Sequence, residues 1–134
     1  MKISILLPYK ENFSSDYAGA VSIFIKDTVN TSEFKKNIIV YGNTKLKNIF
    51  KINYINLDYK KSFIKSSSKS YILEFLKKEE KNKSNIIEFH NRPLYLKYLI
   101  KLNYAKKILY FHNNPLEMNG SKSIDERKYL INNL

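Results

Sequence analysis

Two nearly identical segments hold the only two histidines of the chain. These segments are Phe89-His90-Asn91-Arg92-Pro93 and Phe111-His112-Asn113-Asn114-Pro115, and each follows a short apolar run. A histidine can accept or donate a proton near neutral pH, and an asparagine side chain offers paired donors and acceptors. One such segment alone is more typical of a turn that ends a strand, whereas two copies in the same setting favour a functional site.

The carboxylates near these segments and in the first loop are Glu11, Asp16, Glu88 and Glu117. Asp16 is better placed to cap a helix than to act as a base, and Glu88 is expected to point to a sheet face and to be paired. The sequence has no Asp-x-Asp pair and no His-Glu-x-x-His helix, which argues against a dedicated metal site. It also lacks the nucleophile elbow of hydrolases and the glycine fingerprints of dinucleotide and P-loop sites.

A third candidate region is the polar loop over residues 8–19, which ends at Gly19. A glycine there lets the backbone approach a ligand closely, and the free N–H groups of the following helix attract anions. The alternative is that Gly19 only permits close packing of the helix on a strand. The two interpretations are equally compatible with the sequence.

Alternating apolar runs and helical patterns indicate the elements that would position these residues. Strands are expected at residues 2–7, 37–41, 52–57, 86–89 and 107–111. Helices are expected at residues 17–29 with Asp16 as N-cap, through Leu46 and Ile49, at 62–83, from Pro93 through Leu102, and from Ile124 onward with Ser123 and Glu126 as a capping box. This alternation predicts an α/β fold, a Rossmann-like doubly wound and mostly parallel sheet, with ligands at the carboxyl ends of its strands.

Length and composition favour one domain spanning residues 1–134. The chain has 134 residues, 43% of them hydrophobic, and no cysteine. No apolar run approaches the ~20 residues that cross a bilayer, and no signal-peptide cleavage site follows the first strand. We therefore expect a cytoplasmic protein. Because a doubly wound domain would continue beyond the last predicted helix, the sequence also reads as a truncated domain.

The net charge of +12 comes almost entirely from lysines that are spread along the sequence. Dispersed lysines are more typical of solvated faces than of a site for a polyanion, because specific recognition of phosphates and bases favours arginine. A weak attraction to an anionic membrane or to a phosphorylated substrate stays open.

Three segments resemble the N-terminal domain of glycosyltransferase family 4, in the type that builds bacterial lipopolysaccharide and cell-surface polysaccharide. They are ILLPYKENFSSDYAGAVSIFIKD, IIEFHNRPLYLKYL and ILYFHNNPLEMNGSKSIDERKYLI, and YFHNNPLEMNGSKS is the most specific of them. The resemblance covers most of the chain in order, although residues 44–83 match only in pattern. It implies half of a two-domain GT-B fold, whose C-terminal, donor-binding domain is absent from this sequence.

The resemblance also implies roles for single residues. The first loop of the family faces the donor diphosphate and the transferred sugar, which points to Ala18, Gly19 and Ala20. Many members have two adjacent glycines there, so Ala-Gly-Ala guarantees close backbone approach only at Gly19. The histidine after the fifth strand lies beside the reacting sugar and maps to His112. The acceptor side would be lined by His90, Asn91, Arg92, Asn113 and Glu117.

The implied function is transfer of a sugar from a nucleotide-sugar donor to a glycan or lipid-linked acceptor. The family generally retains the anomeric configuration and uses no metal, so no cofactor is expected. Peripheral contact with the inner face of the membrane is an open alternative to a purely cytoplasmic location. The chain alone is expected to be inactive, because half of an interdomain cleft cannot hold the transition state.

Two other functions compete with this interpretation. A basic α/β module could bind nucleic acid with its aromatic residues, which make up 14% of the chain. This is disfavoured because Tyr17, Phe24, Tyr71, Phe75 and Tyr98 fall on predicted core stripes. A degenerate transferase half could instead serve as a non-catalytic subunit that binds carbohydrate or a partner protein.

Overall fold

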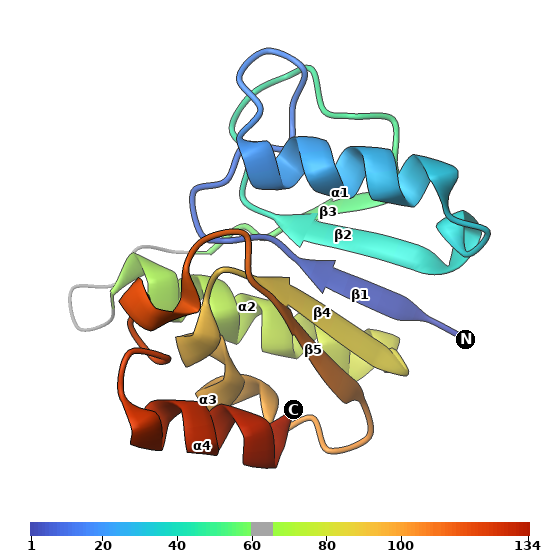
Figure 1. The fold of residues 1–134 in the computed structure, drawn as a ribbon. Helices are drawn as coiled ribbons and strands as arrows, with labels where there is room; N and C mark the ends of the chain where they lie inside the picture. Colours follow the sequence, from blue (N-terminus) through green and yellow to red (C-terminus); the bar gives the residue numbers. More distant parts are fainter. Residues whose placement is uncertain (60–65) are drawn as a thin grey trace.

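A five-stranded sheet with only parallel neighbours forms the centre of the protein in the computed structural model, which describes residues 1–59 and 66–134 (Figure 1). The strand order is β3-β2-β1-β4-β5. The strands are β1 (Ile3–Leu6), β2 (Ile38–Gly42), β3 (Tyr54–Asn56), β4 (Ile86–His90) and β5 (Lys106–Tyr110). The α/β fold class is thereby confirmed, and the architecture is consistent with a Rossmann-like doubly wound sheet.

Helices cover both faces of the sheet. Helix α1 (Ala20–Thr31) lies on one face, and α2 (Ser67–Asn82), α3 (Leu96–Leu99) and α4 (Ile124–Asn133) lie on the other (Figure 1). The described residues also form three short 3-10 turns: η1 (Lys35–Asn37), η2 (Pro93–Tyr95) and η3 (Pro115–Glu117). Strand order reverses between β1 and β4, which is the position where open α/β sheets bind ligands.

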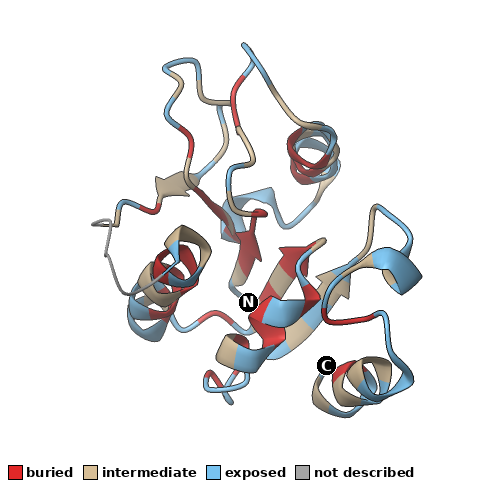
Figure 2. Cartoon of the chain, turned by 90° about the vertical axis from the view of Figure 1, so that its left-hand side faces the viewer, coloured by how far each residue is buried: buried red, intermediate tan, exposed pale blue. Residues whose placement is uncertain are grey.

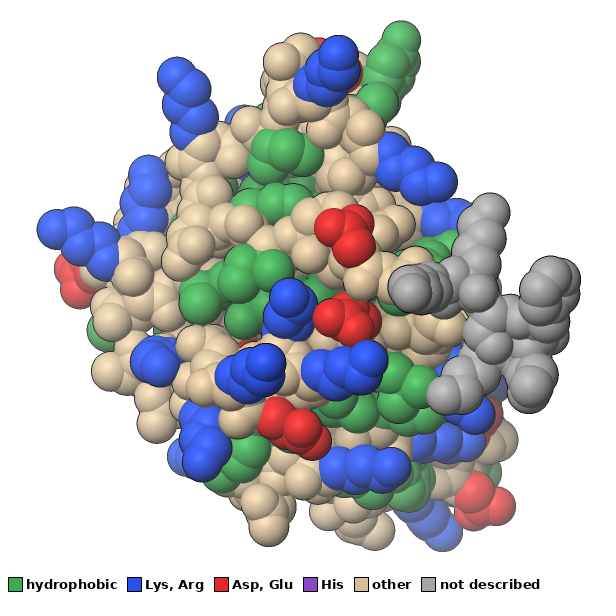
Figure 3. All heavy atoms as spheres, turned by 180° about the vertical axis from the view of Figure 1, so that it is seen from behind, with side chains coloured by type: hydrophobic (Ala, Val, Ile, Leu, Met, Phe, Trp, Pro, Cys, Tyr) green, Lys and Arg blue, Asp and Glu red, His purple; other side chains and the backbone are tan. Residues whose placement is uncertain are grey.

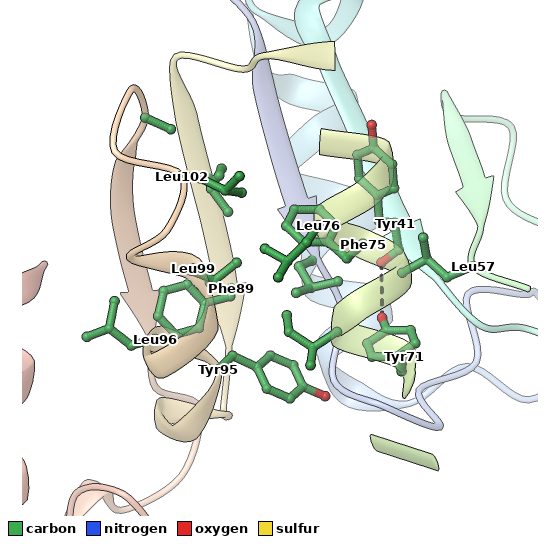
Figure 4. Close-up of a cluster of buried hydrophobic side chains, with 14 of the residues drawn as sticks. Tyr41, Leu57, Tyr71, Phe75, Leu76, Phe89, Tyr95, Leu96, Leu99 and Leu102 are labelled. Atoms are coloured by element: carbon green, nitrogen blue, oxygen red, sulfur yellow. Dashed lines mark hydrogen bonds between the residues drawn. The ribbon is translucent and has the colours of Figure 1, made fainter. Parts of the chain in front are cut away.

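The alternation of side chains along the strands creates two hydrophobic cores, one on each face (Figure 2). Along β1 and the residue after it, Ile5 and Leu7 pack in the core under α1, whereas Leu6 packs in the core under α2. In the larger core, Tyr71 and Phe75 of α2 are fully buried (Figure 4). Each such side chain contributes about 1.5–3 kcal/mol through burial.

Polar side chains are buried at the amino edge of the sheet, opposite the predicted ligand edge. The Glu79 carboxylate accepts hydrogen bonds from the Ser4 hydroxyl (2.6 Å) and the Ser84 backbone N–H (2.6 Å). Burial, followed by the charge of Glu79, raises the pKa of Tyr41 to about 12. These bonds satisfy a carboxylate that has no solvent exposure, and they join α2 to β1.

The first helix begins later than the sequence predicts. Helix α1 starts at Ala20 with Gly19 as N-cap, and Asp16 is not its cap. The Asp16 carboxylate instead accepts a hydrogen bond from the side-chain amide of Asn48 (2.8 Å). Tyr17 therefore lies outside the helix and is 76% exposed, so its assignment to a core stripe is wrong.

The helix expected through Leu46 and Ile49 does not form, and residues 43–50 have an irregular path. This segment packs against the first loop: Ile49 makes an isolated antiparallel bridge with Ser14, and the Thr44 hydroxyl accepts a hydrogen bond from the Phe13 N–H (2.9 Å). Contacts with a loop distant in sequence thus override the local helical pattern.

The remaining elements agree with expectation apart from their ends. Strand β3 is shorter than the expected strand at 52–57, and the helix expected from Pro93 to Leu102 is formed by η2 and a single-turn α3. Helix α2 begins at Ser67 with Ser66 as N-cap, and residues 62–65 of the expected helix lie outside the described residues. Among the residues that the structure describes, no helix is long and apolar enough to cross a membrane.

Candidate functional site

A cavity of about 700 Å³ lies at the edge where β1, β4 and β5 end. Its walls come mainly from the three loops that follow these strands, because parallel strands bring their carboxyl ends to the same edge. Tyr9 and Glu11 come from the first loop, Asn91 and Arg92 from the second, and Asn113 from the third. The structure therefore places a cavity where the sequence analysis expects ligands to bind.

The two histidine–asparagine segments contact each other directly. The Asn91 side-chain oxygen accepts a hydrogen bond from the backbone N–H of His112 (2.8 Å), and the Asn91 N–H donates to the Tyr110 carbonyl (2.9 Å). Asn91 has a φ of 50°, a left-handed conformation that asparagine tolerates better than most residues. The turn after β4 thus fixes the backbone of the turn after β5.

The side chains of the two histidines are joined as well. His90 Nδ1 lies 2.8 Å from His112 Nε2, and His90 Nε2 lies 2.7 Å from Glu88 Oε1. Glu88 and His90 are two residues apart on β4, so their side chains lie on the same face of the sheet. The expectation that Glu88 is paired is confirmed, and its partner is His90.

Aromatic rings surround the histidine pair. The Phe24 ring of α1 meets the His112 ring edge-on at a centroid distance of 4.9 Å, and the Tyr110 ring lies 4.8 Å from it. Burial and then the nearby His90 lower the pKa of His112, which is only partly offset by the negative charges of Glu11 and Glu88. The pKa shift favours the neutral imidazole near neutral pH.

The predicted acceptor-side residues divide into two groups. Asn91, Arg92, Asn113 and Glu117 all line the cavity. His90 has no exposed surface and does not reach the cavity, while His112 is partly exposed and directly precedes Asn113 of the cavity wall. The structure thus brings four of the five expected acceptor-side residues together at the cavity and places the fifth, His90, away from its wall.

The structure does not place the glycine of the first loop at the cavity, although the sequence predicts that this glycine faces a diphosphate. Ala18, Gly19 and Ala20 do not belong to the cavity wall. The Glu11 side chain lies at the start of α1, where one carboxylate oxygen accepts a hydrogen bond from the Ser22 N–H (3.0 Å). A Cβ atom on Gly19 would overlap this carboxylate. The N–H groups at this helix end therefore already face a negative charge from the chain itself.

Several residues of the cavity wall have no counterpart among the sequence-based candidates, above all Tyr9, Tyr95 and Lys122. The Tyr59 hydroxyl donates a hydrogen bond to the Tyr9 hydroxyl oxygen (2.9 Å), which is the main cause of a lowered pKa of Tyr9. The Tyr95 hydroxyl accepts a hydrogen bond from the Tyr9 N–H (3.1 Å). Tyr9 directly follows Pro8, which ends the first predicted strand. This position at the carboxyl end of a strand is the sequence feature that could have placed Tyr9 at the ligand edge.

Within the described ranges 1–59 and 66–134, no group of three or more carboxylate or histidine side chains is arranged to hold a metal ion. Comparison of the chain with protein-family models, with curated proteins and with solved structures gave no match.

Proposed function

We propose that this chain is the acceptor-side domain of a glycosyltransferase that moves a sugar from a nucleotide-sugar donor to a glycan or lipid-linked acceptor. The resemblance to glycosyltransferase family 4 suggests the reaction, with retention of anomeric configuration and without a metal. The side chains that line the cavity are the main support for the proposal that this domain binds the acceptor.

Three kinds of side chain in the cavity wall suit a polyhydroxylated ligand. The amides of Asn91 and Asn113 can donate and accept hydrogen bonds at the same time, as sugar hydroxyls require. Arg92 and Glu117 add a charged donor and a charged acceptor, whose hydrogen bonds are stronger than neutral ones. Tyr9 supplies a ring with a polar tip, which combines apolar contact area with a hydrogen-bonding group.

The Glu11 carboxylate makes the start of α1 an unfavourable place for the diphosphate of the donor. A diphosphate at the start of α1 would have to displace this carboxylate from the Ser22 N–H, because two negative groups do not share one helix end favourably. We therefore assign the cavity to the acceptor and only a secondary role in donor binding to residues 18–20. His112 would orient the reacting groups from its position next to Asn113 of the cavity wall.

Acceptor binding can be measured on the chain as it is. Saturation-transfer NMR with a panel of methyl glycosides (glucoside, galactoside, mannoside and N-acetylglucosaminide) should identify at least one ligand. Arg92→Ala and Asn113→Ala should each weaken its binding about tenfold, since a hydrogen bond to a charged or well-placed polar group is worth about 1–2 kcal/mol. We expect binding without sugar transfer by the 134-residue chain.

Lys36→Ala is the matched control, because Lys36 is exposed in η1, ahead of the amino end of β2 and away from the cavity. This variant should bind the glycoside like the parent chain. Absence of binding to every glycoside, or equal binding by the Arg92, Asn113 and Lys36 variants, would argue against an acceptor site in this cavity.

A further inference from the structure

Glu88, His90 and His112 form a continuous chain of hydrogen bonds that ends at the ligand edge of the sheet. Both ring nitrogens of His90 take part, Nε2 toward Glu88 Oε1 (2.7 Å) and Nδ1 toward His112 Nε2 (2.8 Å). Among the described residues, no hydrogen bond involves His112 Nδ1. The chain of hydrogen bonds therefore has one end at a partly exposed carboxylate, a fully buried His90 in the middle, and one end with an unused ring nitrogen.

The carboxylate decides the direction of these hydrogen bonds. An ionised carboxylate only accepts, so the proton between Glu88 and His90 belongs to His90 Nε2. In a neutral imidazole the other nitrogen is then an acceptor, so His90 Nδ1 must receive a proton donated by His112 Nε2. A neutral His112 that carries its proton on Nε2 leaves Nδ1 with a free lone pair.

We propose that Glu88 and His90 are positioning residues that hold His112 in the tautomer protonated at Nε2, so that His112 Nδ1 is a hydrogen-bond acceptor for a ligand hydroxyl. We further propose that the three residues act as a proton relay. The contact with a ligand hydroxyl rests on the proposed function, whereas the relay is a property of the chain without any ligand.

The relay step conserves one proton and its charge. A proton that arrives from the site forms an N–H bond at His112 Nδ1. The Nε2–H bond of His112 breaks, and its proton crosses the hydrogen bond to His90 Nδ1, which lies 2.8 Å from His112 Nε2. A new N–H bond forms at His90 Nδ1. His90 becomes the cation and lies against the Glu88 carboxylate, while His112 is neutral again with its proton on Nδ1.

The groups around the pair favour this placement of charge. Glu88 of β4 contacts His90 directly, and Glu11 of the first loop acts on His112 only through space. Phe24 of α1 and Tyr110 of β5 face the rings with uncharged aromatic groups. Burial and the neighbouring His90 lower the pKa of His112, which disfavours a positive charge at that ring. The Glu88 carboxylate lies against His90 Nε2 and is the negative group in direct contact with the pair.

The presence of only two histidines makes the proposal directly measurable by NMR. In a sample isotope-labelled at the histidine nitrogens, the four ring nitrogens can be observed without interference. At about pH 7, we expect Nε2 of both rings to be protonated and Nδ1 of both rings to be bare. We also expect a scalar coupling across the hydrogen bond from His112 Nε2 to His90 Nδ1. A His112 protonated at Nδ1, or no coupling between the rings, would overturn the proposal.

Glu88→Gln tests the relay, with Glu11→Gln as the matched control. Loss of the Glu88 charge should lower the pH at which the histidine pair takes up its proton by about one unit, because the cation then has no adjacent carboxylate. Glu11→Gln removes an equal charge without breaking the chain of hydrogen bonds, and its shift should be clearly smaller. Equal shifts in the two variants would show that charge alone, and not the relay, governs the pair.

These measurements need no sugar and therefore separate the two proposals. If the tautomer and the coupling are found but no glycoside binds, the proposed function fails and the relay stands. If a glycoside binds but the rings are not coupled, the acceptor site stands and the relay fails.

Discussion

Glu11 and Gly19 constrain each other at the start of α1. Gly19 has φ −75° and ψ 166°, values that any residue can adopt, so its backbone conformation does not require glycine. The space does, because a Cβ atom at this position would overlap the Glu11 carboxylate. Glycine is therefore needed here because any larger residue would displace the Glu11 carboxylate from the Ser22 N–H at the start of the helix.

Gly19→Ala should destabilise the protein by about 1 kcal/mol, since the Glu11 side chain can swing away only by giving up its bond to the Ser22 N–H. Chemical denaturation would measure this loss. Glu11→Ala should cost a similar amount, and the double variant should cost little more than either single variant. Additive losses in the double variant would contradict a common cause.

The two histidines illustrate which part of a site the sequence can predict. Each histidine directly follows an apolar strand, so both could be assigned to the ligand edge from pattern alone. The bond between their rings depends on the register that sets His90 opposite Tyr110, and no local pattern specifies that register. The burial of His90, and hence its supporting role, could not be predicted for the same reason.

At the scale of single elements, α4 is the helix whose start is best defined by its own sequence. The Ser123 hydroxyl accepts a hydrogen bond from the Glu126 N–H (3.1 Å), and the Glu126 carboxylate accepts one from the Ser123 N–H (2.9 Å). This is the expected capping box, and its backbone hydrogen bonds lower the pKa of Glu126.

A lowered pKa in the folded state means that Glu126 stabilises α4 above its unfolded pKa, and that this stabilisation is lost as the pH falls through the folded value. We therefore expect α4 to fray below about pH 4.5, the ordinary pKa of a glutamate. Amide hydrogen exchange of residues 124–128 would measure this fraying. Glu126→Gln should remove most of the pH dependence of the protection factors in α4, which are exchange rates relative to the unfolded chain at the same pH, while Asp125→Asn, at an exposed neighbouring position, should leave it largely intact.

The elements differ in how well the sequence predicts them, and the difference follows from where their hydrogen bonds lie. Helix α4 carries its capping groups within four residues, so local pattern is sufficient. Residues 43–50 instead bond to Phe13, Ser14 and Asn56, which are distant in sequence. These long-range hydrogen bonds outweigh the local helical pattern of apolar residues, and a local pattern does not specify partners so far away in the sequence.

The positive charge is a property of the whole molecule. Lysine and arginine side chains are dispersed over the face seen from behind, with acidic side chains between them (Figure 3). Few lysines form ion pairs in the described part of the chain, and those pairs join residues that are close in sequence. A net charge of +12 on a domain of this size produces self-repulsion that salt can screen.

Added salt should therefore stabilise the protein. Raising sodium chloride from about 20 to about 200 mM shortens the screening length severalfold, and we expect the melting temperature to rise by a few degrees. A variant with Lys36, Lys78 and Lys101 all replaced by glutamine keeps the fold but carries less charge, since all three side chains are exposed. Its melting temperature should respond less to salt; an equal or greater response would point to a specific ion effect instead of general repulsion.

Strand β5 is bonded to β4 on one side only, at the end of the five-stranded order. His112 follows β5 after Phe111, and its ring reaches His90 only while that ladder is intact. Edge strands are the parts of a sheet that open most readily. The lifetime of the β4–β5 ladder thus sets an upper limit on the lifetime of the histidine pair. Each opening of β5 would break the hydrogen bond between the two histidine rings, so the opening rate of this edge strand would limit how long the pair can share a proton.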